Sequence, residues 1–286
     1  MDFKRIEWIF FLAFLGLNVF LFSMYREAKM NQTITSRTNE TIPLHKRLES
    51  ENITYEGDFS SRKREGYYLS GVPTNFDEAR KSERLRLNNP DLLGRQTTIE
   101  DNLLKHKVED VILLTDVNQA PEVIAKILNQ QGLVLFGKEY QYNVEESTLS
   151  NDFPEIIAGQ FYEDIIINDP ASRITFFLEK ETEHWRVNEY IQTHISELQP
   201  LREIMPTYSE RDAINTLYIN NQIPSNSKIL WRQLAYKMTL IVRGQAIFVP
   251  TWFIEIETSD HEIKTEMVNA FTNRIITNSV VATVED

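Results

Sequence analysis

The feature that most constrains this chain is a long apolar run near its start. The run IEWIFFLAFLGLNVFLFSMY extends from Ile6 to Tyr25, with Lys4 and Arg5 before it and Arg26 and Lys29 after it. At a rise of about 1.5 Å per helical residue, this run covers roughly 30 Å, the thickness of the hydrocarbon core of a bilayer. The sequence therefore predicts a transmembrane helix over residues 6–25.

A cleaved signal peptide is the alternative, but the run is longer than a typical signal core. The segment SMYREAKMNQ that follows also offers no A-x-A-like cleavage site. The basic residues on the two sides of the run nearly balance, so they do not decide the orientation. We expect residues 1–5 to form a cytoplasmic tail and the long remainder of the chain to lie outside the cell.

Three small or polar residues interrupt the apolar character of the run. Gly16 and Asn18 lie near its middle, and Ala13 lies one turn before Gly16. Small residues allow a neighbouring helix to approach closely, and an amide in the bilayer gains by bonding to a partner helix. Ala13, Gly16 and Asn18 are therefore the candidate partner-binding residues. The open alternative is that Asn18 bonds back to its own helix in a lone anchor.

Charge and cysteine content limit the partners of the exported part. The chain has 30 Lys+Arg against 42 Asp+Glu, a net charge of -12. Bulk electrostatics therefore disfavours nucleic acid, anionic lipid headgroups and polyanionic wall polymers as ligands. Cysteine is absent, which excludes disulfide staples, a disulfide-linked partner and thiolate metal sites. The ectodomain must bury an ordinary hydrophobic core.

The expected organisation after the anchor is a polar spacer over residues 26–60, an N-terminal ectodomain half over 61–150 and a C-terminal half over 151–286. Hydrophobic periodicity and turn residues separate helices from strands. The helices are expected over residues 78–87, 99–107, 120–131 and 210–222. The strands are expected over residues 66–76, 110–116, 133–145, 161–169, 172–181, 185–198, 230–242, 245–258 and 264–276, the last segment forming a hairpin.

The later half contains the clearest local signals. Ser209 followed by Asp212 resembles a capping box at the start of a helix, and Ile214, Leu217 and Tyr218 form its apolar stripe. We expect this stripe to pack on the sheet that contains the strand 245–258. Within that strand Pro250 is expected at a bulge or an edge, because proline donates no ladder hydrogen bond.

Motifs for phosphate binding or nucleophilic catalysis are absent from the sequence. Neither G-x-G-x-x-G, a Walker loop nor G-x-S-x-G occurs, and no two histidines have the spacing of metal ligands. We therefore predict no catalytic residue, no cofactor and no metal. The five histidines are His45, His106, His184, His194 and His261.

Glu255 and Glu257, with His261 nearby, form the one acid–base constellation in the sequence. Two carboxylates on one strand face could serve as acid and base in a glycosidase. They are better explained as the solvent side of a strand whose other face is Trp252 and Ile254, because nothing adjacent would separate their pKa values. A wall hydrolase is therefore only a weak candidate.

Several segments together resemble the YycI family, bitopic membrane proteins of low-GC Gram-positive bacteria that accompany YycH and the essential cell-wall sensor kinase WalK, also called YycG. These segments are MDFKR, GYYLSG, ERDAINTLYINNQIP, FVPTWFIEIE and MVNAFTNRII. The resemblance implies an α+β fold: an N-terminal transmembrane helix, then an extracytoplasmic domain of antiparallel sheets with packed helices, in two subdomains related to those of YycH.

The family resemblance also implies a function. It implies a single-pass protein of the cell membrane that regulates the WalK/YycG two-component system. The implied partners are a YycH-like membrane protein and the kinase, contacted through the transmembrane helix and the ectodomain. No enzymatic activity is expected.

The alternative function comes from the C-terminal half, whose strand-helix-strand pattern and closing VNAFTNRII resemble PepSY-like domains ending in D-A-x-T-G. Here Asn269 replaces the acidic residue and Asn273 replaces the glycine. This second resemblance implies an extracytoplasmic ligand-binding or protease-inhibiting module.

Overall fold

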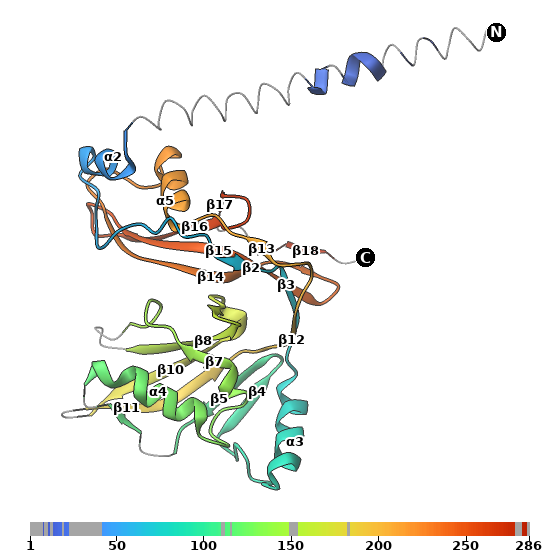
Figure 1. Cartoon of the computed structure of the whole chain (residues 1–286). Coiled ribbons are helices and arrows are strands. Elements are labelled where there is room, and N and C mark those ends of the chain that lie inside the picture. The colour runs from blue at the N-terminus through green and yellow to red at the C-terminus, as the bar shows by residue number, and fades with distance from the viewer. Residues whose placement is uncertain are drawn as a thin grey trace. The chain divides into compact units, whose positions relative to one another are not determined.

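The computed structural model describes residues 8, 11, 14–18, 20–22, 42–109, 112–114, 116–148, 154–181, 184–277 and 282–284. The chain divides into two compact units, Met1–Ile53 and Thr54–Asp286. In the first unit, every described residue of the apolar run is helical, and α2 (Leu44–Ser50) follows Pro43 (Figure 1). No helix within the described residues combines the length and the apolar character needed to cross a membrane.

The segment expected as a polar spacer, residues 26–60, contains the helix α2. It was assigned from its polar composition, yet α2 lies within it and buries Leu44 and Leu48. These two leucines are four residues apart and so share one face of the helix. The backbone N–H of Ile53 then donates to the carbonyl oxygen of Leu48 at 2.9 Å. A few well-spaced apolar residues were therefore enough to order this part of the chain.

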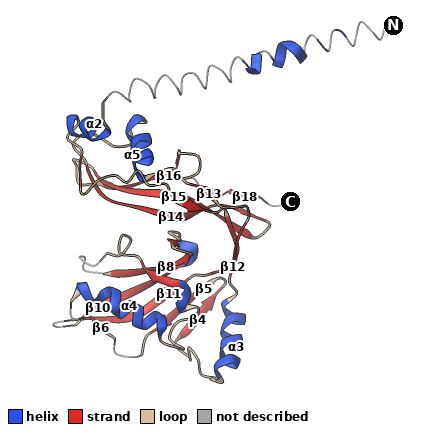
Figure 2. Cartoon of the chain, in the orientation of Figure 1, coloured by secondary structure: helices blue, strands red, loops and turns tan. Residues whose placement is uncertain are grey.

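The second unit is a mixed α+β structure in which antiparallel sheets predominate (Figure 2), as the sequence predicts. We call its two larger sheets the terminal sheet and the central sheet. The terminal sheet consists of β1 (Thr54–Tyr55), β3 (Leu69–Pro73), β12 (Ile195–Pro200), β14 (Lys228–Val242), β15 (Gln245–Glu257), β16 (Ile263–Asn269), β17 (Arg274–Ile276) and β18 (Ala282–Val284).

The central sheet is built from the chain between β3 and β12. Its strands are β4 (Thr97–Glu100), β5 (Leu103–Lys107), β6 (Leu113–Leu114), β7 (Tyr140–Tyr142), β8 (Glu155–Tyr162), β9 (Ile165–Ile166), β10 (Arg173–Lys180) and β11 (Trp185–Gln192). A third, two-stranded sheet pairs β2 (Glu65–Gly66) with β13 (Met205–Pro206). The chain therefore leaves the terminal sheet after β3 and returns to it through β12.

The terminal sheet is organised around the hairpin of β14 and β15. The two strands pair from Lys228 with Glu257 to Val242 with Gln245, with register shifts after Ile229 and after Met238. Arg243 and Gly244 turn the chain with positive φ. On its other side β15 pairs with β3 as far as Phe248 and with β16 from Thr251 onward. Pro250 lies at this change of partner, which explains how a proline is accommodated inside a long strand.

Helix α5 (Glu210–Ile219) covers the terminal sheet as expected. Its N-terminus carries the capping box of Ser209 and Asp212, in which the two residues satisfy each other's backbone N–H groups. Ile214 and Leu217 are fully buried, and the helix contacts β15, β16 and β17. The predicted helix and its packing face are confirmed, with Tyr218 at the margin as a half-buried residue.

The core of the central sheet lies beneath α3 (Phe76–Leu87) and α4 (Ala120–Asn129). Asn75 caps α3 by accepting from the N–H groups of Asp77 and Glu78, and α4 has a proline in its first turn. The buried side chains from these helices include Phe76 and Ile124, which join a cluster with strand residues such as Tyr190. Short 3-10 turns connect the elements at η1 (Val117–Gln119), η2 (Gly137–Glu139) and η3 (Pro170–Ser172).

Four predicted elements differ from the structure. The strand expected over 161–169 is divided between β8 and β9, and the strand expected over 185–198 is divided between β11 of the central sheet and β12 of the terminal sheet. Residues 99–107 form the antiparallel hairpin of β4 and β5 rather than a helix, because burial alternates along β5 and Asp101 turns the chain at φ 50°. Of the expected strand over 133–145, only β7 forms. The residues before β7 make turns, and a Cβ at Gly137 would lie 2.0 Å from the carbonyl oxygen of Leu128. That close approach requires glycine and bends the chain against the end of α4.

The expected boundary between residues 150 and 151 does not separate the two sheets. β7 and β8 lie on opposite sides of this boundary and pair with each other in the central sheet. The two sheets are also joined to each other, because Asn168 N donates to Tyr236 O at 2.9 Å and Lys237 Nζ lies 3.0 Å from Asp169 Oδ2. The composition along the chain could not reveal that the central sheet is an insertion between two terminal-sheet strands.

Candidate functional site

The predicted partner-binding residues lie in the first unit. Ala13 is outside the described residues. Asn18 donates from its side-chain amide to the carbonyl oxygen of Phe14, one turn earlier, at 2.8 Å. A Cβ placed on Gly16 would meet no atom within 4 Å. The amide donor of Asn18 is therefore satisfied within its own helix, whereas the surface at Gly16 is open to a neighbour.

The two carboxylates of the acidic constellation on β15 have different hydrogen-bond partners. Trp231 Nε1 donates to Glu255 Oε1 at 2.9 Å, whereas Glu257 Oε1 lies 2.7 Å from Nδ1 of the exposed His261. Burial raises the pKa of Glu255, and the nearby carboxylates of Glu146 and Glu145 raise it further against the opposing hydrogen bond from Trp231. The Glu257 hydrogen bond raises the pKa of His261. Each carboxylate thus has its own partner, and the hydrogen bond of His261 is to Glu257.

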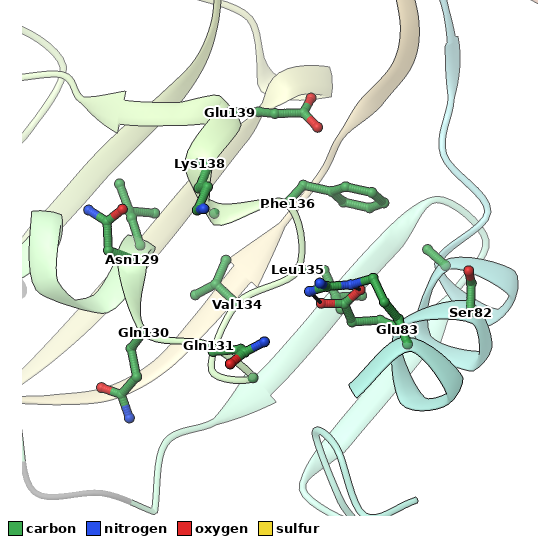
Figure 3. Close-up of a pocket in the computed structure, with 15 residues that line it drawn as sticks. Ser82, Glu83, Asn129, Gln130, Gln131, Val134, Leu135, Phe136, Lys138 and Glu139 are labelled. Carbon is green, nitrogen blue, oxygen red and sulfur yellow. Dashed lines mark hydrogen bonds and ion pairs between the residues drawn. The ribbon is translucent and has the colours of Figure 1, made fainter. Parts of the chain in front are cut away.

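A groove opens in the central-sheet region (Figure 3). We call it the α3–α4 groove. It has a volume of about 610 Å³ and lies between α3 and the segment that runs from the end of α4 to η2. Glu83 and Arg86 form an ion pair on α3, and Phe136 and Glu139 border the groove from the other segment. The groove therefore combines both signs of charge with an aromatic ring.

Hydrogen bonds to β11 hold the groove's second wall in place. The Tyr190 hydroxyl donates to Leu133 O at 2.6 Å, and Gln192 Nε2 donates to Leu135 O at 2.6 Å. Both donors are buried. Because buried donors of this kind need a partner, the irregular backbone of residues 133–135 is fixed onto the sheet without being a strand.

A buried histidine, His194, links the two segments by which the chain passes between the terminal sheet and the central sheet. His194 is 2% exposed and lies between β11 and β12. Its Nε2 is 3.0 Å from Glu139 Oε2, its Nδ1 is 2.6 Å from Thr74 Oγ1, and the ring of Phe136 stacks on it at 4.1 Å between centroids. Thr74 follows β3, and its N–H donates to His194 O at 2.9 Å. Side chain and backbone therefore tie together these two segments.

Gln160 of β8 joins the same network. Its side-chain nitrogen donates to Ile195 O at 2.8 Å and lies 3.1 Å from both Glu139 Oε2 and His194 Nε2. The His194 hydrogen bond lowers the pKa of Glu139, and burial opposes it with a smaller effect.

The order Thr74, His194, Glu139 has the form of a nucleophile, base and orienting acid, but it does not form a reactive site. Thr74 is 5% exposed, and its hydroxyl is also shared with Ser196. A catalytic nucleophile must reach a substrate, and this hydroxyl is enclosed. Among the described residues, no three side chains of the metal-binding types gather as a site either. The network is a structural cross-link.

Sequence reasoning missed this network, because its members are far apart in the chain and no local motif connects them.

A family model described as YycI protein matches residues 29–271. The chain belongs to the YycI family. This membership is consistent with a regulatory, non-catalytic role in the YycFG system and with association with the membrane. The α3–α4 groove and the His194 network lie inside the region that matches the family, whereas Gly16 and Asn18 precede it.

Two further comparisons add little to the family assignment. No curated protein matches this YycI-family chain. A solved structure titled as the crystal structure of an uncharacterized protein from Eubacterium rectale ATCC 33656 is similar with a TM-score of 0.40 and 7% sequence identity. The similarity covers 80% of this chain and 91% of the other.

Proposed function

We propose that this YycI-family chain is a non-catalytic, membrane-anchored regulator of the essential cell-wall two-component system. It acts with a YycH-type partner on the WalK/YycG sensor kinase. The observation that carries the proposal is the family match over residues 29–271, joined to the apolar run that precedes it. The separate partners of Glu255 and Glu257 and the enclosed hydroxyl of Thr74 support a role without catalysis.

The proposed membrane mechanism uses two faces of the N-terminal helix. Successive helical residues turn by about 100°, so Gly16 and Asn18, two residues apart, point to nearly opposite sides. Ala13 is on the Gly16 side. One face therefore allows close packing of a neighbouring helix, and the other presents an amide. Two faces suit two neighbours, the YycH-type helix and a kinase helix. Asn18 would exchange its bond to Phe14 for an interhelical one.

Crosslinking in the cell tests the helix mechanism. Because the chain contains no cysteine, single cysteines along residues 6–25 report contacts without background. Asn18→Leu should weaken one partner contact by about 0.6 to 2 kcal/mol, the scale of interhelical hydrogen bonds, and Gly16→Ile should block the other sterically. Leu17→Ile is the matched control and should change neither. If the double variant kept both crosslinks and the transcriptional output at the wild-type level, the mechanism would be contradicted.

Topology is tested separately with a reporter fused after Asp286. The proposed orientation places residues 1–5 in the cytoplasm and the C-terminal domain outside the cell. A reporter enzyme that is active only outside the cytoplasm should therefore be active in this fusion. The same enzyme fused before residue 1 should be inactive. Activity of a cytoplasmic reporter after Asp286 would contradict the orientation.

A second candidate function is the PepSY-type ligand-binding or protease-inhibiting module, and the turn between β16 and β17 favours it. Asn269 Oδ1 accepts from the N–H groups of Phe271 and Thr272 at 2.9 and 3.0 Å, as an acidic residue would. Asn273 has φ 54°, the conformation that glycine adopts easily. Release of the ectodomain from its anchor separates the candidates, because an inhibitor keeps its activity in solution and a helix-dependent regulator loses it.

A further inference from the structure

A cluster of basic, aromatic and aliphatic side chains lies on the surface of the second unit, where β2 pairs with β13. We call it the basic–aromatic patch, and it consists of Lys63, Tyr68, Leu201, Arg202, Ile204 and Tyr208. All of these side chains except the half-buried Tyr68 are exposed. Leu201 is 48% exposed and Ile204 is 45% exposed. Exposed aliphatic side chains beside cations are an unusual combination on an acidic protein.

Backbone and ring contacts hold this patch together. Met205 pairs with Gly66, and Leu201 N donates to Tyr68 O at 2.8 Å. The Arg202 guanidinium lies 6.0 Å from the ring centroid of Tyr68, and Lys63 Nζ lies 5.7 Å from that of Tyr208. Each cation is thus held beside an aromatic ring.

The tyrosine residues of the patch also contact the terminal sheet. The ring of Phe271 packs on Tyr68 at 4.8 Å, Tyr208 N donates to Ala270 O at 2.7 Å and Tyr208 O accepts from Trp252 Nε1 at 2.9 Å. Tyr68 and Tyr208 are therefore held against β15 and the turn after β16.

The charge of the patch is opposite to that of the chain. Residues 62–68 and 201–208 contain Arg62, Lys63, Arg64 and Arg202, against the two carboxylates of Glu65 and Glu203. No ion pair joins Lys63 or Arg202 to a carboxylate among the described residues. The chain as a whole has a net charge of -12. An anionic surface therefore repels most of the molecule and attracts this patch, which orients the molecule.

The geometry points to an anionic lipid bilayer as the partner of the basic–aromatic patch. This inference rests on the membrane anchoring proposed above. Basic residues are attracted to anionic headgroups, tyrosine rings prefer the interface, and exposed leucine and isoleucine side chains gain by reaching the acyl boundary. A polyanionic polymer would attract the cations but offers no apolar layer for Leu201 and Ile204.

Chain length permits this contact. The expected anchor ends at Tyr25 and α2 begins at Leu44, so 18 residues lie between them. A chain spans at most about 3.3 to 3.6 Å per residue, so this connection can return the patch to the bilayer that holds the anchor. In this arrangement the second unit lies on the membrane on one defined face, which leaves its other faces to protein partners.

The experiment uses the full chain reconstituted in bilayers with nitroxide-labelled headgroups. Ile204→Cys supplies a unique site for a nitrobenzoxadiazole fluorophore, because the chain has no cysteine. We expect strong quenching in bilayers rich in phosphatidylglycerol, weak quenching in phosphatidylcholine alone, and a decrease in high salt. The same fluorophore at Leu85→Cys, an 84% exposed position on α3, should stay unquenched in both.

Charge-reversal variants decide the assignment. Lys63→Glu with Arg202→Glu should lower the equilibrium constant for bilayer contact about 25-fold or more, because each basic residue near an anionic surface contributes about five-fold. Lys81→Glu with Lys126→Glu changes the net charge equally at exposed positions elsewhere and should leave quenching intact. Unchanged quenching in the first variant, or equal quenching in both lipids, would overturn the inference.

Two further outcomes separate this inference from the proposed function. Flotation with the vesicles reports the anchor alone, so a chain that floats but shows no lipid-dependent quenching keeps the anchoring and loses the patch contact. A chain that fails to float removes both. Protection of the Ile204→Cys label that requires a YycH-like protein instead of anionic lipid would assign the patch to a protein partner and overturn the lipid inference.

Discussion

Arg232 Nε lies 2.6 Å from Glu210 Oε1, and the two side chains are only 14% and 13% exposed. The pair joins the middle of β14 to the first turn of α5. The same guanidinium donates to Glu56 O at 2.8 Å and lies 5.1 Å from the ring centroid of Phe59, and Ser60 N donates to Glu210 Oε2 at 3.2 Å. One ion pair therefore fixes the segment by which the chain enters the second unit.

The first prediction concerns this pair. Arg232→Met leaves the Glu210 carboxylate nearly buried without its cation, and we expect a loss of about 3 kcal/mol in the free energy of unfolding. Lys228→Met is the control, because its pair with Glu56 has a 4.0 Å separation and exposed side chains. It should cost no more than about 0.5 kcal/mol. Chemical denaturation of both variants in detergent measures the difference, and equal losses would contradict the assignment.

A second prediction tests the packing of α5. Leu217 is fully buried against the terminal sheet, so Leu217→Ala should cost about 2 to 5 kcal/mol through lost burial and an unfilled cavity. Leu85→Ala on α3 removes the same atoms from an 84% exposed side chain and should change the melting temperature little. Thermal melting followed by circular dichroism compares them. Similar melting temperatures for the two variants would place α5 on the surface.

The third prediction concerns the pH dependence contributed by Glu255. Because burial raises its pKa, the folded chain binds its proton more tightly than the unfolded chain does. The resulting penalty is absent below the ordinary pKa of 4.5 and is fully present once the pH exceeds the raised value. Glu255→Gln keeps an acceptor for Trp231 and should raise the melting temperature at pH 7. The gain should vanish near pH 4, and a gain independent of pH would point to another cause.

Glu139 gives a prediction of the opposite sign. The His194 hydrogen bond lowers its pKa, so its ionised form stabilises the folded chain above the ordinary pKa of 4.5, and this contribution is lost as the pH falls through the lowered value. Glu139→Gln should therefore lower the melting temperature at pH 7 and converge with the wild type in acid. Glu122→Gln, at an exposed position of α4, should have little effect at either pH. Equal melting temperatures of Glu139→Gln and wild type at pH 7 would contradict the proposed linkage.

The sequence predicts correctly those elements whose determining residues lie close together in the chain. The capping box at Ser209 and the apolar stripe of α5 are local patterns, and together they predicted this helix. The helix expected over residues 99–107 is wrong because the buried positions of β5, Leu104 and His106, are two residues apart and share a face only in a strand. Histidine is not an apolar residue, so hydrophobic periodicity did not reveal this alternation.

Local sequence alone determined the apolar run near the N-terminus, the acidic balance, the lack of cysteine, and α5 with the long β14–β15 hairpin. Only the tertiary structure decided that the central sheet is inserted between β3 and β12, and that His194 meets Glu139 and Thr74. The physical reason is that helix caps, turns and periodicity act within a few residues. Strand partners and buried hydrogen bonds, in contrast, depend on burial among segments that are far apart in the chain, as Thr74 and His194 are.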